Sequence, residues 1–221
     1  MVDPIKKILL KHPSNAFINQ RNINEHYHEL NFLAAPNFNS AISGYEKFVD
    51  LLKSFDIEIH YLPKDKSTSL DSIYTHDPCV VSNKGVVICN MGKKARRPEA
   101  DSMETFFHSI EVPILGKIQS PGTLEGGDVV WINEKTIAIG EGYRTNQEGI
   151  EQLKLLLSDQ VETIISVSIP HWNGPNDCLH LMSNLSPIDH DLYLVYSRLL
   201  PVSFIKYLLD QNIELIDVPD D

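Results

Sequence analysis

The stretch Thr123-Leu124-Glu125-Gly126-Gly127-Asp128 runs directly into Val129-Val130-Trp131-Ile132. Two carboxylates and two glycines therefore precede an apolar, β-branched run that predicts a buried strand. A carboxylate beside apolar surface is costly unless a cation or a hydrogen-bond donor meets it. Glycine lets a neighbouring backbone or a flat ligand approach closely. The motif thus predicts a site for a planar cation at the beginning of a strand.

The composition is that of a folded protein with one large domain over residues 1–221. Hydrophobic residues make up 42% of the chain and charged residues 22%. The formal net charge of −11 argues against nucleic acid or an anionic membrane as the main partner and suits a cationic small molecule. No apolar run reaches the roughly 20 residues of a membrane span, and residues 1–7 do not lead into a signal peptide. Three cysteines without disulfide or zinc spacing favour a reducing, cytoplasmic location.

A pattern of two β-rich runs, a helix and a further strand occurs three times along the chain. The first copy has a hairpin over 79–90, a helix over 98–109 and a strand over 112–118. The second has a hairpin over 129–139, a helix over 147–158 and a strand over 164–169. The third has β-rich runs at 179–181 and 192–196, a helix over 202–209 and a strand over 213–218. The N-terminal part predicts a degenerate copy, with strands over 8–10 and 57–62 and a helix over 45–55.

Repetition at an interval of about 51 residues is typical of an array of supersecondary units, none of which can bury its own apolar face. We therefore expect an α/β fold in which ββαβ units form a pseudo-symmetric ring or propeller. An ordinary α/β sandwich with accidental spacing is the alternative. Asp77, Asp128 and His180 stand at corresponding positions of successive units, so a ring would bring them together near its axis.

Asp77, Glu125 and His180 carry the chemistry expected at that axis. Histidine transfers protons near neutral pH, and an adjacent carboxylate fixes its tautomer and stabilises its charged form. Two carboxylates can bind a planar guanidinium or amidinium bidentately. A lone histidine before an apolar run is more often structural, but its placement with three acids at equivalent positions favours a functional role.

Arginines follow the first two hairpins at matching places. Arg96-Arg97-Pro98-Glu99 comes after the first hairpin, and Arg144 comes after the second. Such arginines suit a substrate carboxylate, and solvent-facing or helix-docking arginines are the alternative. The sequence has no His-x-x-x-His or Cys-x-x-Cys spacing and no glycine-rich phosphate loop, so we expect no metal and no other cofactor.

Four segments resemble motifs of the guanidino-modifying enzymes, which include dimethylarginine dimethylaminohydrolases, arginine deiminases and glycine amidinotransferases. The segments are Tyr74-Thr75-His76-Asp77-Pro78, Leu124-Glu125-Gly126-Gly127-Asp128, Gly140-Glu141-Gly142-Tyr143-Arg144-Thr145-Asn146 and Cys178-Leu179-His180-Leu181. They occur in the family's order, and the resemblance extends from about residue 17. It implies the five-unit α/β propeller called the pentein fold and a small guanidino compound as substrate, and it is compatible with a homo-oligomer.

The resemblance also implies roles for these residues. Asp77 would grip the guanidinium nitrogens, Glu125 would pair with His180 and orient the substrate, and His180 would move protons. Arg97 and Arg144 would hold the substrate carboxylate. Asp128 would belong to the substrate site as support at the mouth of the strand.

The nucleophile that the resemblance implies is missing at the expected place. Family chemistry uses a cysteine that attacks the guanidinium carbon, after which water or another amine takes up the amidino group. That cysteine follows a strand like 213–218, whereas here no cysteine follows Cys178. We therefore expect a C-terminally truncated chain, with an incomplete last unit and no activity as it stands. Loss of the nucleophile from the gene product is the alternative, and Cys178 itself is expected to be a packed structural cysteine.

Met182 refines the expected activity. Deiminases usually carry an aspartate two residues after the histidine, so methionine there favours a dimethylarginine-hydrolase-like or amidinotransferase-like enzyme. Hydrolysis and amidino transfer both stay open, because they differ only in whether water or an amine reaches the intermediate. Two further alternatives are a non-catalytic protein that binds guanidino compounds and a structural propeller without a ligand.

Overall fold

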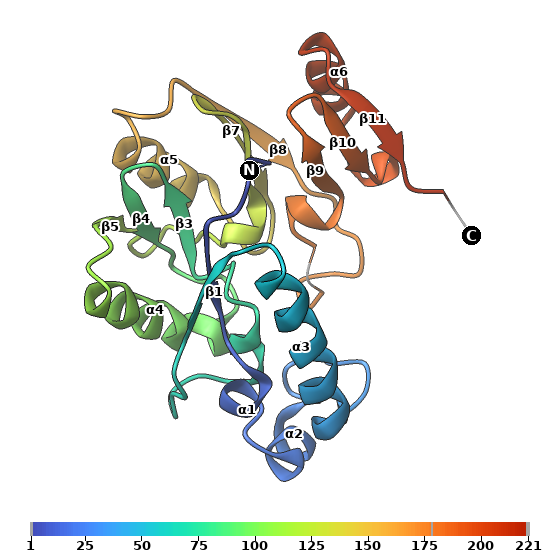
Figure 1. Ribbon diagram of the computed structural model, residues 1–221. Coiled ribbons are helices and arrows are strands. Elements are labelled where there is room, and N and C mark those ends of the chain that lie inside the picture. Colours follow the sequence, from blue (N-terminus) through green and yellow to red (C-terminus); the bar gives the residue numbers. More distant parts are fainter. Residues whose placement is uncertain (1, 178, 220–221) are drawn as a thin grey trace.

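The computed structural model describes residues 2–177 and 179–219, which form a mixed α/β fold with four small, separate sheets (Figure 1). Three sheets have three strands each and follow one another along the chain, and the fourth has two strands. In the described part of the chain, no helix is long and apolar enough to cross a membrane. Cys178, for which the sequence predicts a packed structural role, lies outside the described residues.

The three larger sheets are each built from one ββαβ unit. The first unit is β3 (Cys79–Ser82), β4 (Gly85–Ile88), α4 (Arg97–Ser109) and β5 (Ile114–Lys117). The second is β6 (Val129–Asn133), β7 (Thr136–Glu141), α5 (Gln147–Leu156) and β8 (Thr163–Ser168). The third is β9 (Leu185–Asp189), β10 (Leu192–Val195), α6 (Val202–Asp210) and β11 (Glu214–Asp217). In every unit the first two strands are antiparallel and the third runs parallel to the second, so the predicted ββαβ repeat is confirmed.

The third unit begins later than the sequence predicts. Residues 179–181 are not a strand; instead Leu181–Ser183 form a short 3₁₀ turn, η4, and β9 starts at Leu185. The backbone N–H of His180 donates to Ser183 Oγ, and that of Leu181 donates to the Asp128 carboxylate. These backbone donors are satisfied by side chains outside any sheet, so this segment has no need of a strand partner.

The N-terminal part contributes one parallel strand pair and three helices. Its elements are β1 (Lys7–Leu10), α1 (Pro13–Ala16), α2 (Gln20–His26), α3 (Phe38–Lys53) and β2 (Glu58–Tyr61). The long helix starts earlier than the predicted 45–55, because the Asn37 side chain caps it by accepting from the backbone N–H of Ser40. Among the residues that the structure describes, no hairpin strand accompanies β1 and β2, which agrees with the prediction of a degenerate copy.

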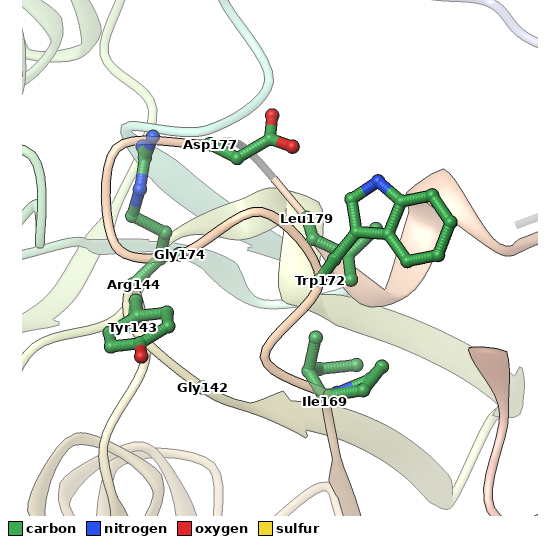
Figure 2. Close-up of a pocket in the computed structure, with 9 residues that line it drawn as sticks. Gly142, Tyr143, Arg144, Ile169, Trp172, Gly174, Asp177 and Leu179 are labelled. Atoms are coloured by element: carbon green, nitrogen blue, oxygen red, sulfur yellow. The ribbon is translucent and has the colours of Figure 1, made fainter.

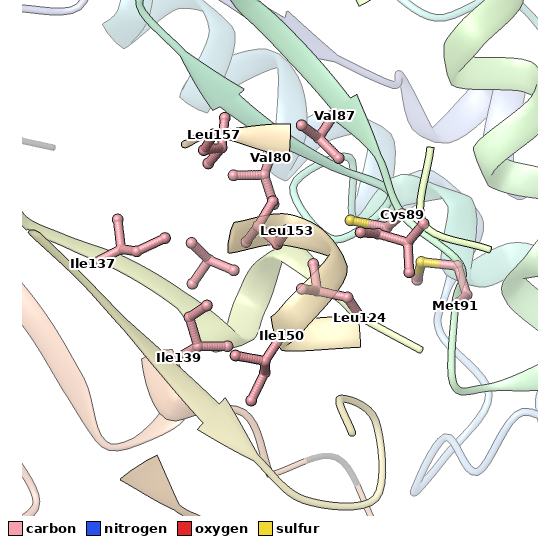
Figure 3. Close-up of a cluster of buried hydrophobic side chains, with 12 residues drawn as sticks. Val80, Val87, Cys89, Met91, Leu124, Ile137, Ile139, Ile150, Leu153 and Leu157 are labelled. Atoms are coloured by element: carbon pink, nitrogen blue, oxygen red, sulfur yellow. The ribbon is translucent and has the colours of Figure 1, made fainter. Parts of the chain in front are cut away.

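The helix of each unit lies between two sheets. Helix α5 packs in an apolar cluster that joins the first unit to the second (Figure 3). Helix α6 packs in the corresponding cluster between the second and third units, and α4 packs between the first unit and Leu9 and Leu62 of the N-terminal part. Each helix therefore covers apolar side chains from two neighbours, and a separate apolar cluster joins each pair of consecutive units.

We expect Leu153→Ala in α5 to destabilise the protein by about 2–5 kcal/mol, because Leu153 is fully buried between the first two units. Leu155→Ala is the matched control on the same helix, since that side chain is 73% exposed and should cost less than about 0.5 kcal/mol. Urea denaturation of both variants measures the difference. Equal losses would contradict the layered core.

Candidate active site

The centre of the site is a buried contact between Glu125 and His180. Glu125 precedes the 3₁₀ turn η3 (Gly126–Asp128) that leads into β6, and His180 precedes η4 ahead of β9. Glu125 Oε2 lies 2.8 Å from His180 Nε2, and the two side chains are 0% and 8% exposed. The carboxylate can therefore orient the imidazole and stabilise its charged form. The structure brings these two predicted residues together.

Glu125 is held as an anion by Arg144, His180 and a backbone donor. Arg144 Nη1 lies 3.1 Å from Oε2, and the backbone N–H of Lys93 donates to Oε1 at 3.0 Å. Burial acts to raise the pKa of Glu125, but the hydrogen bond with His180 and the charge of Arg144 outweigh it and hold that pKa at about 2. The Glu125 carboxylate is therefore a fixed negative charge beside the His180 imidazole, a group that can transfer protons.

Asp77 lies on the other side of the imidazole. Its Oδ1 atom is 3.8 Å from His180 Nδ1 and accepts a hydrogen bond from the backbone N–H of Gly127 at 3.1 Å. Asp77 precedes β3, so the three predicted residues reach the same place from the beginnings of three units. The histidine ring therefore lies between two carboxylates, as the predicted convergence requires.

Gly127 makes this convergence sterically possible. A Cβ atom on Gly127 would lie 2.4 Å from His180 Nδ1 and 2.7 Å from Asp77 Oδ1. No real Cβ atom tolerates such contacts, so one of the two functional side chains would have to move. The glycine in the motif therefore serves the close approach of these side chains to the backbone.

Asp128 is buried and supports the site through both carboxylate oxygens. Oδ2 accepts from the Thr145 hydroxyl at 2.6 Å, and Oδ1 accepts from the backbone N–H of Leu181 at 3.0 Å. Burial raises the pKa of Asp128 to about 6, against the opposing effect of the positive charge of His180 and these hydrogen bonds. Because Leu181 follows His180 directly, Asp128 holds the histidine segment against the second unit.

Arg144 lies where it can serve both Glu125 and a ligand. It comes two residues before Asn146, whose side chain accepts from the backbone N–H of Gly149 and caps α5. Arg144 is 6% exposed, and its Nη1 atom bonds Glu125. Within residues 2–177 and 179–219, its other guanidinium N–H groups have no hydrogen-bond partner. They are therefore available to an anionic group.

The two neighbouring arginines, Arg96 and Arg97, lie in different surroundings. Arg97, the predicted carboxylate ligand, is exposed, and its Nε atom donates to the backbone oxygen of Met91. Arg96 is buried instead, with Nη1 2.5 Å from Asp77 Oδ2 and Nη2 2.8 Å from Glu99 Oε2. The structure thus brings Arg96, and not Arg97, to Asp77. Glu99, in the first turn of α4, is three residues after Arg96 and pairs with it. This spacing is the sequence signal that distinguishes Arg96 from Arg97.

A second ion pair was not predicted from the sequence. The Lys93 ammonium lies 2.6 Å from Asp71 Oδ2 and donates to the backbone oxygen of Leu30 at 2.8 Å. The Lys93 and Asp71 side chains are 18% and 6% exposed. Asp71 belongs to a short 3₁₀ helix, η1 (Leu70–Ile73), that precedes the first ββαβ unit.

A cavity of about 270 Å³ lies against Lys93 and Arg144, both of which bond Glu125. Its lining residues are Asn31, Gly92, Lys93, Lys94, Tyr143, Arg144, Pro175 and Asn176. A smaller crevice adjoins it at Tyr143 and Arg144, and Figure 2 shows the Arg144 side chain extending there toward the segment that carries Asp177. Three lining residues of the larger cavity are cationic and none is acidic, so the cavity suits an anionic group.

Comparisons with known proteins identify a matching family and related proteins. A family model described as arginine deiminase matches residues 69–212. N(G),N(G)-dimethylarginine dimethylaminohydrolase from Pseudomonas aeruginosa is 25% identical over 189 residues, which are 86% of this chain and 69% of that protein. Arginine deiminase from Listeria welshimeri is 34% identical over 106 residues, or 44% of this chain and 26% of that protein.

A solved structure shows the same fold. The P. aeruginosa dimethylarginine dimethylaminohydrolase, in a variant with one cysteine replaced by serine and in complex with citrulline, superposes with a TM-score of 0.75. The sequences are 23% identical, and the superposition covers 97% of this chain and 76% of the other.

The fold and the matched family define the class: the chain belongs to the arginine deiminase family, within the superfamily of guanidino-modifying enzymes. It spans about two thirds of the dimethylaminohydrolase and about a quarter of the arginine deiminase that it matches.

We expect Gly127→Ala to displace Asp77 or His180 and to destabilise the protein by about 1–3 kcal/mol, because the new methyl group overlaps both side chains. Gly44→Ala in α3 is the control, since a Cβ there meets nothing within 4 Å. That control should leave stability unchanged or raise it by up to about 1 kcal/mol. Thermal unfolding and the ring NMR signals of His180 measure both effects. Unchanged His180 signals in Gly127→Ala would contradict the close approach.

A pH dependence follows from Glu125. Its folded-state pKa of about 2 lies below the ordinary value of 4.5, so its contribution to stability is complete above about pH 4.5 and is lost as the pH falls toward 2. We expect the stability difference between wild type and Glu125→Gln to shrink by about 1–2 kcal/mol between pH 5 and pH 3. Urea denaturation across this range measures it. A difference that stays constant or grows on acidification would argue against an ionised Glu125.

Proposed function

We propose that this chain forms the substrate-binding and proton-transfer site of an enzyme that acts on the guanidinium carbon of an arginine-like substrate through cysteine covalent catalysis. The activity is that of a hydrolase of the dimethylarginine dimethylaminohydrolase type or of an amidinotransferase. The observation that carries the proposal is the placement of His180 between Glu125, 2.8 Å from one ring nitrogen, and Asp77, 3.8 Å from the other. Carboxylates suit a guanidinium, and a histidine between them suits proton transfer to a leaving amine.

The chemistry divides into two balanced steps. A cysteine thiolate attacks the guanidinium carbon and forms a C–S bond; a C–N bond then breaks, and the amine leaves with a proton from His180. Water or a second amine next attacks the same carbon while His180 takes up its proton, and the C–S bond breaks. Water completes a hydrolysis, and an amine completes an amidino transfer. In both steps Glu125 keeps the histidine oriented and Asp77 holds guanidinium nitrogens.

In this proposal neither Cys79 nor Cys89 is the nucleophile. Both are buried, and burial raises the pKa of Cys79 to about 12 and that of Cys89 well above its ordinary value, so neither forms a thiolate readily. Cys178, for which the sequence predicts a packed structural role, lies outside the described residues. In this proposal the attacking thiolate belongs to a cysteine outside these 221 residues, in a further unit that completes a propeller around the axis at His180. The cysteine that was replaced by serine in the citrulline-bound relative supports a cysteine-dependent site.

The second candidate is a protein that binds guanidino compounds without turning them over. The burial of both described cysteines favours it for the chain as it stands. Turnover of dimethylarginine or arginine, assayed on the product of the complete coding sequence, separates the two candidates. Turnover there supports the enzyme, and binding without turnover supports the binding protein.

We expect Asp77→Asn to weaken binding of guanidino compounds by about tenfold or more, because it removes one charge from the guanidinium site. Asp159→Asn is the control, since that carboxylate forms an exposed ion pair with Lys84 away from the site and its loss should leave binding unchanged. Isothermal titration calorimetry measures both variants. Unchanged affinity in Asp77→Asn would count against the assigned grip.

His180→Ala should abolish turnover in a form of the protein that carries the nucleophile, while substrate affinity stays within about threefold of wild type. A structural histidine would instead lose stability and binding together. Single-turnover kinetics and calorimetry of the same variant separate the two roles. Persistent turnover would show that another group moves the proton.

A further inference from the structure

The hydroxyl group of Thr145 connects two acidic residues of the site. Its Oγ1 atom donates to Asp128 Oδ2 at 2.6 Å and accepts the backbone N–H of Glu125 at 3.1 Å. A threonine hydroxyl has one O–H donor and two acceptor lone pairs, so it can form both hydrogen bonds at once. The Thr145 side chain is fully buried, so it does not touch a ligand. Its hydroxyl acts only on other residues of the protein.

The two hydrogen bonds of this hydroxyl lead to both members of the Glu125–His180 pair. On one side, Thr145 holds the backbone of Glu125, whose carboxylate lies 2.8 Å from His180 Nε2. On the other side, Asp128 accepts the backbone N–H of Leu181, the residue that follows His180. One hydroxyl thus joins the turn that carries the carboxylate to the segment that carries the imidazole.

Thr145 is itself held in place by the turn before it and the helix after it. Its backbone oxygen accepts the N–H of Gly142 at 2.9 Å, and the next residue, Asn146, caps α5. The preceding residue, Arg144, bonds the Glu125 carboxylate at 3.1 Å. Two consecutive residues therefore hold Glu125 from opposite ends, Arg144 at the carboxylate and Thr145 at the backbone.

The hydroxyl also favours the ionised form of Asp128. Burial raises the pKa of Asp128 to about 6, and the hydrogen bonds from Thr145 and Leu181 oppose this rise. An ionised carboxylate accepts hydrogen bonds at both oxygens, as Asp128 does here. Without the hydroxyl, a buried N–H of Glu125 and a buried oxygen of Asp128 would both lose this partner, and a buried polar group without a partner is costly.

We infer that Thr145 is a positioning residue, whose hydroxyl keeps the Glu125 carboxylate and the His180 imidazole in the relative placement that proton transfer requires. This inference rests on the proposed function and adds to it a residue that acts through the pair and does not touch the substrate. Small displacements matter in such a pair, since a misplacement of about 1 Å can cost about a hundredfold in rate.

The experiment compares Thr145→Val, which keeps the shape of the side chain and removes the hydroxyl, with Thr145→Ser, which keeps the hydroxyl. The first readout is the exchange of the His180 Nε2–H proton with water, measured by NMR on the 221-residue chain. The ionised Glu125 carboxylate only accepts, so this proton lies in the hydrogen bond between the two side chains. Exchange should be at least about tenfold faster in Thr145→Val and within about threefold of wild type in Thr145→Ser.

The second readout is turnover by the product of the complete coding sequence. Thr145→Val should lower kcat by about tenfold to a hundredfold and leave KM within about threefold, because Thr145 acts on proton transfer and not on ligand binding. Thr145→Ser should restore most of the rate.

Thr136→Val is the matched control. It is the same substitution at another buried position, at the opposite end of β7 from Gly140, which lies beside Asp128. This control should leave both the proton exchange and kcat unchanged.

Asp128→Asn tests the same connection from its other end, since an amide has one oxygen where the carboxylate has two. Its effects should match those of Thr145→Val, and the double variant should be no slower than either single variant, because both remove one connection. Circular dichroism and thermal unfolding show which variants are folded. Should Thr145→Val not fold, Asp128→Asn and Thr145→Ser decide the question by the same two readouts.

The outcomes separate this inference from the proposed function. A folded Thr145→Val protein with the proton exchange and kcat of wild type, or a Thr145→Ser protein as impaired as Thr145→Val, would overturn the role of Thr145 and leave the proposed function intact. Absence of turnover in the complete wild-type protein would overturn the proposed function and this inference with it.

Discussion

The buried carboxylate of Glu125 is the constraint on which the rest of the structure depends. A fully buried anion is tolerated only when donors and cations surround it. Those partners come from every ββαβ unit: the backbone N–H of Lys93 from the first, Arg144 from the second and His180 at the start of the third. The hydrogen bonds to Glu125 therefore connect the same units that the apolar clusters connect. The polar contacts form only when the units pack in this arrangement.

Polar contacts between units, rather than long elements, position the functional side chains. Asp77 receives the backbone N–H of Gly127, and Asp128 receives the backbone N–H of Leu181. Each contact fixes the loop before one strand pair against the loop before another. These hydrogen bonds hold the histidine ring between two carboxylates.

Charge is separated across the site. On one side the imidazole of His180 lies between the carboxylates of Asp77 and Glu125, whereas Lys93, Lys94 and Arg144 line the cavity next to them. Arg144 belongs to both sides, since it bonds Glu125 and also lines the cavity. A molecule with a guanidinium at one end and a carboxylate at the other matches this separation. The net charge of the whole chain, −11, says nothing of this local arrangement.

The sequence by itself determined the units and their order, because hairpins, helices and the interval between Asp77, Asp128 and His180 are local or periodic features. The spacing put Asp77, Asp128 and His180 at equivalent positions, and the pairing of Glu125 with His180 was implied by the family resemblance. Only the tertiary structure decided which neighbouring cation is used: Arg96 rather than Arg97 at Asp77, and Lys93 at Asp71. The packing of distant segments decides which residue at the start of a helix, or in a turn, is buried. Adjacent residues of like charge are therefore indistinguishable until those segments are in place.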